Sequence, residues 1–298
     1  MALPFARMAI LATLAVLGAI KPQPGTALLL SRRPFLFTKA SSRLRAAAAM
    51  ASLGNGGGEP RLLLTSAGLT TPALESSFRR MLSRVTAEGT RPKIAMLVTA
   101  QMCGSGEKST STNPKRRSPG ELRRRRWADA RKKGKEIEQA LGIEVECVDC
   151  AREDQPAELY REPLSSAECI WVLGGNTFFL WHWMRRSGVD EIIKQRVLED
   201  GVVYVGQSAG SIVAGSTIRT AYWKGWDDPS AAPDADWTDE AQLKAMGLAP
   251  DGIAFFPHYT DEWAAVVEEK KGEVERIVCL TDDGASSLVC GDEVTEDD

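Results

Sequence analysis

One stretch of the chain places a serine where its hydroxyl can act as a nucleophile. Residues 201–220 read GVVYVGQSAGSIVAGSTIRT, an apolar run followed by small residues typical of a helix. Ser208 lies between Gly206 and Gly210 in the pattern G-x-S-x-G, which allows a tight strand-to-helix turn with the serine at its tip. The amide of Ala209 would open the helix, where free N–H groups favour developing negative charge. We interpret Ser208 as a nucleophile and the Ala209 amide as half of an oxyanion hole; the alternative is a Gly/Ser-rich turn without chemistry.

A serine hydroxyl is a weak nucleophile until a base takes its proton, and histidine suits that task near neutral pH. The chain has two histidines. His182 lies in the aromatic stretch FFLWHWM, where an imidazole is usually a packed residue of a helix. His258 ends the apolar segment GIAFFPH (252–258), and we expect it at the same C-terminal edge of the sheet as Ser208. We predict that His258 is the general base.

An acid that orients the imidazole would complete a catalytic triad, and four aspartates are candidates. Asp282 and Asp283 lie after His258 in the turn-like LTDDGA, whereas Asp227 and Asp228 lie before it in WKGWDDPS. Aspartate is also an ordinary turn residue, so most of the four need no catalytic role. The residues alone leave this choice open.

A glycine pair ends another apolar segment, ECIWVLGGN (168–176), with the residues Gly174, Gly175 and Asn176. Glycines at a strand end let the backbone approach a ligand closely. We expect this segment to supply the second oxyanion amide or a contact with the substrate.

Short apolar runs alternate with helical patterns along residues 59–298. This alternation predicts one α/β domain with three layers, in which helices cover a mostly parallel sheet. The expected strands are 61–66, 93–100, 143–150, 168–176, the run that ends at Gly206, 252–258 and two within 277–290; the expected helices are 72–85, 123–141, 177–187, 189–200 and 261–275.

Residues 1–58 have the composition of a targeting leader. They contain seven Lys or Arg residues and no Asp or Glu, and the apolar run 8–20 resembles the core of a signal peptide. The rest of this segment is rich in Arg, Ser and Ala, as in organelle transit peptides. We expect import into an organelle, with a plastid favoured; secretion and a cytosolic protein that starts at Met50 are the alternatives.

The remaining chain is acidic, with 30 basic and 40 acidic residues. A basic insertion at about 101–126 interrupts the α/β pattern, and eleven Lys or Arg residues fall between 115 and 135. Trp127 is the one aromatic residue in that stretch, and no nucleic-acid-binding motif lies beside it, so a solvated basic helix face is the favoured interpretation.

The six cysteines lie mostly in apolar runs, which is typical of reduced core thiols. Cys147 and Cys150 have a redox spacing, but their segment reads as a strand, whereas redox pairs open a helix. We expect no disulfide, metal or cofactor, and neither histidine lies near the cysteines. A homodimer is left open.

Three motifs carry a resemblance to a known family. LGGNTFFL (173–180), VYVGQSAGSIVAGSTIRT (203–220) and FPHYTDEW (256–263) occur in this order and resemble the peptidase E family of serine dipeptidases, the aspartyl dipeptidases, whose relatives include cyanophycinase. The similarity covers roughly residues 60–290. It implies a flavodoxin-like or class I glutamine-amidotransferase-like sheet, with Ser208 as nucleophile, His258 as base, and neither metal nor cofactor.

The resemblance also bears on the acid and on the substrate. In the family, a Pro-Glu-Gly turn after the histidine supplies one proposed acid, and this acid matches Asp283 here. Another acid has been proposed after the serine, and its nearest counterparts here are Asp227 and Asp228. Bacterial members bind an N-terminal aspartyl residue through an arginine, but the comparable stretch 271–275 carries Glu275. Arg276, Arg219 or Lys271 are the candidates to replace that arginine.

We therefore expect a serine exopeptidase that cleaves short peptides, with an N-terminal Asp as one candidate specificity, through Ser208, His258 and Asp283. Two alternatives stay open. An esterase of the α/β-hydrolase type also uses G-x-S-x-G, but orders its triad Ser, Asp, His, which would require Asp227 or Asp228. A catalytically silent protein would instead use the basic insertion to bind nucleic acid or an acidic partner.

Overall fold

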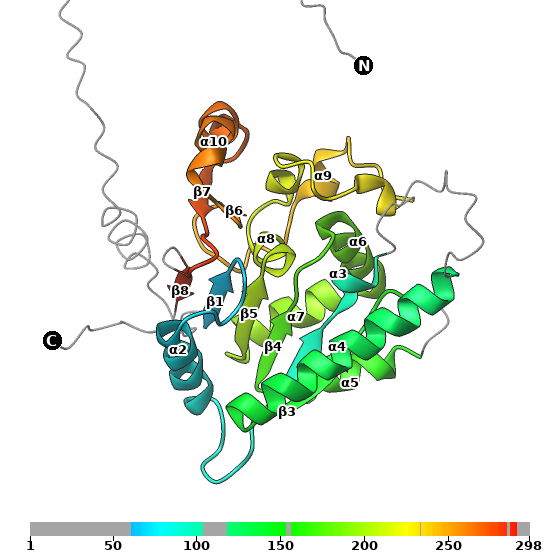
Figure 1. Ribbon diagram of the computed structural model, residues 1–298, viewed down its shortest axis with the longest axis vertical. Coiled ribbons are helices and arrows are strands. Elements are labelled where there is room, and N and C mark those ends of the chain that lie inside the picture. The colour runs from blue at the N-terminus through cyan, green and yellow to red at the C-terminus, as the bar shows by residue number, and fades with distance from the viewer. Residues whose placement is uncertain (1–60, 104–117, 153–155, 233, 285–286, 291–298) are drawn as a thin grey trace, which may run out of the picture. The chain divides into compact units, whose positions relative to one another are not determined.

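The computed structural model describes residues 61–103, 118–152, 156–232, 234–284 and 287–290 (Figure 1). The predicted leader, residues 1–58, lies outside the described residues, and so do residues 104–117 of the basic insertion. The described residues all fall within one compact unit. In these ranges, no helix has the length and apolar character needed to cross a membrane.

A six-stranded sheet forms the centre of this unit, with strand order β3-β2-β4-β5-β1-β8. Five strands are parallel, and β8 pairs antiparallel with β1 at one edge (Figure 1). The strands are β1 (Leu62–Thr65), β2 (Lys93–Leu97), β3 (Glu144–Val148), β4 (Cys169–Val172), β5 (Val203–Gln207) and β8 (Leu288–Cys290). Counted from β2, the order is the 2-1-3-4 of a flavodoxin-like sheet, and β1 occupies the fifth place. This confirms the predicted fold class.

Helices cover both faces of the sheet because side chains alternate along each strand. Leu62 and Leu64 face the core packed under α5, α6, α7 and α8, whereas Leu63 faces the core under α2 and α4. The helices are α2 (Pro72–Ser83), α3 (Thr99–Met102), α4 (Pro119–Leu141), α5 (Glu158–Ser166), α6 (Thr177–Ser187), α7 (Val189–Leu198), α8 (Ala209–Ala214), α9 (Glu240–Leu243) and α10 (Ala264–Lys270). Short 3-10 turns are η1 (Arg219–Tyr222), η2 (Pro229–Ala231), η3 (Asp261–Trp263) and η4 (Lys271–Glu273).

The segment that ends at His258 does not extend the central sheet, which corrects the expected placement of residues 252–258. β6 (Ile253–Phe256) pairs in parallel with β7 (Arg276–Cys279) in a separate two-stranded sheet. The edge of the central sheet beside β1 is instead occupied by β8, from the end of the chain. The predicted helix 261–275 is likewise divided into η3, α10 and η4.

The basic helix begins earlier than its composition suggested, at Pro119 instead of residue 123. Ser118 accepts a hydrogen bond from the Glu121 amide while the Glu121 side chain accepts one from the Ser118 amide, and Pro119 occupies the first helical position. This capping box starts the helix inside the basic insertion, four residues before the expected start of the helix at residue 123. Residues 119–126 are therefore helical.

Five cysteines are free thiols: Cys103, Cys147, Cys150, Cys169 and Cys279. Cys150 is buried, its Sγ lies 3.3 Å from the Thr99 hydroxyl, and burial raises the pKa of its thiol to about 12. A thiol with so high a pKa stays protonated at neutral pH, so Cys150 acts as a core side chain, and the half-buried Cys147 packs against the opposite core.

Candidate active site

Ser208 lies in the tight turn between β5 and α8 and has a backbone conformation that non-glycine residues rarely adopt, with φ 53° and ψ −111°. Its amide donates to the Thr65 carbonyl at 2.9 Å. A Cβ atom at Gly210 would lie 2.1 Å from the Val172 carbonyl oxygen, and one at Gly206 would lie 2.9 Å from that of Gly210. The glycines are therefore required for the chain to turn so sharply, and the turn presents the serine hydroxyl at the strand end.

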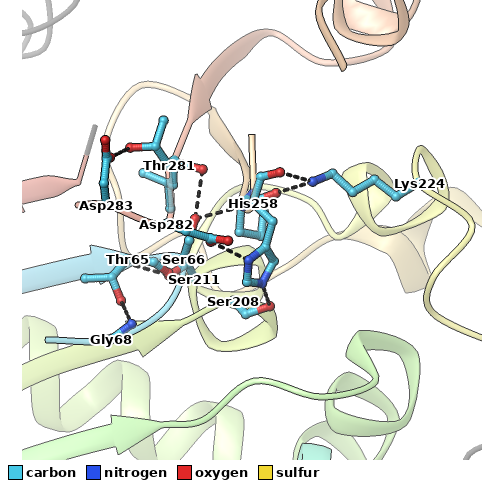
Figure 2. Close-up of polar contacts among 12 residues, drawn as sticks. Thr65, Ser66, Gly68, Ser208, Ser211, Lys224, His258, Thr281, Asp282 and Asp283 are labelled. Carbon is cyan, nitrogen blue, oxygen red and sulfur yellow. Dashed lines mark hydrogen bonds and ion pairs between the residues drawn. The ribbon is translucent and has the colours of Figure 1, made fainter. Parts of the chain in front are cut away.

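The imidazole of His258 connects Ser208 to a carboxylate (Figure 2). Its Nε2 lies 2.9 Å from the Ser208 Oγ, and its Nδ1 lies 2.5 Å from Oδ1 of Asp282. Ser208, His258 and Asp282 thus form one continuous hydrogen-bonded chain, the arrangement that serine hydrolases use. His182 lies elsewhere, in α6, with its ring packed edge-on against Trp183.

The small sheet brings the base and the acid together. β6 and β7 run parallel with Phe256 opposite Cys279, so the residues that follow both strands emerge at the same end. The Leu280 amide donates to the Phe256 carbonyl at 3.0 Å, and the Tyr259 amide donates to the Leu280 carbonyl at 2.8 Å. His258 and Asp282 follow within this bonded segment and therefore lie side by side.

Asp282, and not the predicted Asp283, lies against the histidine. The Asp283 carboxylate instead accepts a hydrogen bond from the Thr281 hydroxyl at 2.5 Å, on the other side of the turn (Figure 2). Adjacent residues in a tight turn point in different directions, and a doublet of identical residues does not reveal which one faces inward. The geometry therefore places the alternative candidate, Asp282, against His258 in place of the preferred Asp283.

The other two candidate acids lie at the start of α6. The Asp227 carboxylate accepts from the Thr177 amide at 3.1 Å, and burial raises its pKa. Asp228 caps η2 by accepting from the Ser230 amide at 2.9 Å. Among the described residues, Asp282 supplies the carboxylate bonded to His258.

The predicted glycine pair borders the nucleophile. A Cβ atom at Gly174 would lie 2.8 Å from Cβ of Ser208, and one at Gly175, where φ is 143°, would lie 2.4 Å from the Ala100 carbonyl oxygen. The Asn176 side chain caps α6 at the Phe179 amide and donates to the Asp228 carbonyl. Asn176 thus holds the loop 222–231 in place, a structural use that the sequence did not predict.

Two residues of the site were not identified from the sequence. Lys224 donates through Nζ to the Pro257 carbonyl at 2.8 Å and to the His258 carbonyl, and the exposed ring of Trp226 lies 5.9 Å from the imidazole. The signal was available in WKGWDDPS, where a lysine lies between two tryptophans beside candidate acids.

The cations considered as substitutes for the family's arginine are each engaged in an ion pair. Arg276 binds Asp251 at 2.8 Å and Lys271 binds Glu268 at 2.6 Å. Arg219 binds Glu240.

Comparison with known proteins places this geometry in a family. The model of peptidase family S51 matches residues 125–296, more than half of the chain. The chain belongs to peptidase family S51. Ser208, His258 and Asp282 all lie in the part of the chain that this family model matches.

Curated relatives of this S51 protein carry peptidase names. Peptidase E of Shewanella amazonensis is 40% identical over 101 residues, which are 34% of this chain and 37% of the relative. The "Probable alpha-aspartyl dipeptidase" of Drosophila melanogaster is 36% identical over 112 residues, 38% of this chain and 40% of the relative. The chain therefore spans about two fifths of the length of these two relatives.

Solved structures agree on the fold. A peptidase from an acI-B1 Actinobacterium matches with a TM-score of 0.51 and 16% identity, and the match covers 75% of this chain and 82% of that one. Identity this low supports the fold alone. Within the described ranges of this S51 chain, no cluster of three or more His, Cys, Asp or Glu residues suits a metal ion.

Proposed function

We propose that this S51 protein is a serine-type exopeptidase that hydrolyses short peptides, in the manner of a dipeptidase. The observation that carries the proposal is the continuous chain of hydrogen bonds from Asp282 through His258 to Ser208. These hydrogen bonds matter for acyl transfer because the base must reach the nucleophile while an acid holds the imidazole in its correct tautomer.

The proposed reaction begins when Ser208 Oγ attacks the peptide carbonyl carbon as His258 Nε2 takes its proton. Asp282 stabilises the imidazolium at Nδ1, and the tetrahedral oxyanion accepts hydrogen bonds from the amides of Ala209 and Gly175. His258 then gives the proton to the leaving amine, which departs as the C–N bond breaks and the acyl-serine forms. Water, deprotonated by His258, attacks the acyl-serine and releases the second product, so that the enzyme is regenerated.

The proposal has support from two directions. The relatives bear the names peptidase E and alpha-aspartyl dipeptidase, and the matched segment includes the three residues of the proposed triad. The order Ser208, His258, Asp282 also differs from the Ser, Asp, His order of α/β-hydrolase esterases. It therefore favours a peptidase over the esterase alternative.

The direct test is hydrolysis of a dipeptide panel by the purified protein and by Ser208→Ala. The panel contains Asp-X dipeptides, matched Asn-X and Ala-X dipeptides, and an N-acetylated dipeptide that an exopeptidase should reject. We expect release of free amino acids that Ser208→Ala abolishes. Steep salt-dependent binding of nucleic acid without hydrolysis would favour the silent binding protein instead.

A further inference from the structure

The backbone of His258 is held in a conformation that a histidine rarely adopts. Its φ is 54°, in the left-handed region, immediately after Pro257 at the end of β6. Such a conformation persists only where the surroundings impose it, and residues of this kind are concentrated at functional sites. The direction of the imidazole therefore depends on whatever holds this backbone.

Contacts on both sides of the peptide unit hold it (Figure 2). On one side, the His258 amide donates to the buried hydroxyl of Ser66 at 2.8 Å, and Ser66 donates in turn to the Leu280 carbonyl at 2.8 Å. On the other side, Lys224 Nζ donates to the carbonyl of His258 and, at 2.8 Å, to that of Pro257. One lysine thus fixes two successive carbonyl groups.

Three aromatic rings hold the lysine in turn. Its Nζ lies 4.4 Å from the ring centroid of Trp226, 4.5 Å from that of Phe256 and 4.8 Å from that of Trp263. Ring faces attract a cation at these distances, so the ammonium has a fixed position in spite of its flexible stem. Partial removal of the ammonium from water disfavours its charged form, so burial lowers the pKa of Lys224 to about 8. A lysine kept beside the base in such surroundings is typical of a functional site.

We propose that Lys224 is a positioning residue that sets the backbone of His258 and thereby directs its imidazole at Ser208. The inference rests on the proposed function, since it assigns Lys224 a part in the same triad. The imidazole has to satisfy a 2.9 Å contact with Ser208 and a 2.5 Å contact with Asp282 together. Without the two hydrogen bonds from Lys224, the ring loses the geometry that satisfies both.

A different role for Lys224 gives a different kinetic result. If its ammonium bound an anionic group of the substrate, its removal would raise KM for acidic substrates and spare neutral ones. If it positions His258, its removal lowers kcat for every substrate by a similar factor and changes KM little, because the misplaced group acts in the transition state.

The experiment compares Lys224→Met, which keeps the length of the side chain but removes its charge and donors, with Lys194→Met as the control. Lys194 lies on α7 and pairs with Glu191 at 3.2 Å, a contact that involves none of Ser208, His258 and Asp282. Misplacement of a catalytic group by about 1 Å costs about 10²-fold in rate. We expect Lys224→Met to lower kcat by about 10- to 100-fold for Asp-X and Ala-X alike, and to slow labelling of Ser208 by a neutral phosphonate by the same factor. Lys194→Met should match the wild type.

A second measurement does not need activity. The chain has two histidines, so imidazole NMR of the full chain shows two sets of signals, and His258→Gln identifies one of them. The Nδ1 proton in the short hydrogen bond to Asp282 should resonate far downfield in the wild type. It should shift or disappear in Lys224→Met, while the signals of His182 stay unchanged and report an intact fold.

These results separate the two claims. A wild-type protein that neither hydrolyses peptides nor reacts with the phosphonate would refute the proposed function, and the NMR comparison would still decide the role of Lys224. If the phosphonate labels Lys224→Met at the wild-type rate, and the His258 signals of this variant are unchanged, the positioning role is overturned. A rise in KM for acidic peptides alone, with kcat unchanged, would overturn the positioning role as well.

Discussion

Asp282 Oδ1 lies 2.5 Å from His258 Nδ1, at the ring nitrogen that does not face Ser208. The Asp282 side chain is 61% exposed, whereas that of His258 is 27% exposed. An acid in contact with water is screened, so its effect on the imidazolium is weaker than that of a buried acid. The contact with Asp282 nevertheless fixes the tautomer of His258, because Nδ1 must carry the proton to donate a hydrogen bond to a carboxylate.

Exchange of the two neighbouring aspartates tests this assignment. Asp282→Asn should lower kcat by about 10²- to 10⁴-fold, because an amide neither stabilises the imidazolium nor selects its tautomer. Asp283→Asn, the matched control, should stay within a few-fold of wild type, since its carboxylate accepts from Thr281 in the turn. Kinetics on one dipeptide decide the point, and the assignment is wrong if the two variants exchange these effects.

Ser208 and His258 should behave as one unit. A general base contributes only while there is a nucleophile to deprotonate, so Ser208→Ala, His258→Ala and the double variant should lose similar activity instead of summing. Each loss should be on the order of 10⁴-fold or more. Single-turnover assays with all three proteins provide the comparison. Additive losses would mean that the two side chains act separately.

Gly174 gives a steric test of the site. A Cβ atom there would lie 2.8 Å from Cβ of Ser208 and 3.4 Å from its Oγ. Gly174→Ala should therefore displace the nucleophile and lower the phosphonate labelling rate by about 10- to 100-fold. Gly120→Ala is the control, because nothing lies within 4 Å of a Cβ atom at that position in α4. Equal labelling rates in the two variants would show that the backbone shifts to accommodate the added methyl group without displacing Ser208.

The half-buried charge of Lys224 predicts a pH dependence of stability. Burial lowers the pKa of this lysine from 10.5 to about 8, against the smaller opposing effect of Asp282. Between about pH 8 and 10.5 the unfolded chain therefore binds more protons than the folded one, and the free energy of unfolding rises with pH over that window. Urea unfolding should show the wild type gaining stability relative to Lys224→Met from about pH 7 to about pH 9.5. The thiol of Cys279, whose pKa burial raises to about 11, titrates above this pH range. A constant difference would contradict the lowered pKa.

Much of the fold followed from local patterns. Apolar strands flanked by amphipathic helices predicted the parallel sheet and its helical layers, because burial on both faces requires continuous apolar strands. The early start of α4 was within reach of the same reasoning, since Ser118, Pro119 and Glu121 form a recognisable capping box. The Ser, Pro and Gly residues that precede residue 121 instead favoured an irregular segment, so the start of the helix at Pro119 was not predicted.

The placement of β6 was beyond such reasoning. Its apolar sequence predicts a strand but does not say which strand it pairs with, and the partner β7 follows twenty residues later through α10. The sequence does not decide which segment lies at the edge beside β1, and in the structure β8 pairs there.

By itself, the sequence predicted a nucleophile and a base that the structure brings within 2.9 Å of each other: a serine flanked by glycines favours the strained turn, and His258 follows a segment whose apolar pattern predicts a strand. Tertiary structure alone decided which carboxylate reaches Nδ1 and that Lys224 holds the His258 backbone. Both depend on side-chain directions in turns brought together by the parallel register of β6 and β7. Neighbours in a turn have the same local sequence but opposite directions, so their roles follow from contacts with distant segments.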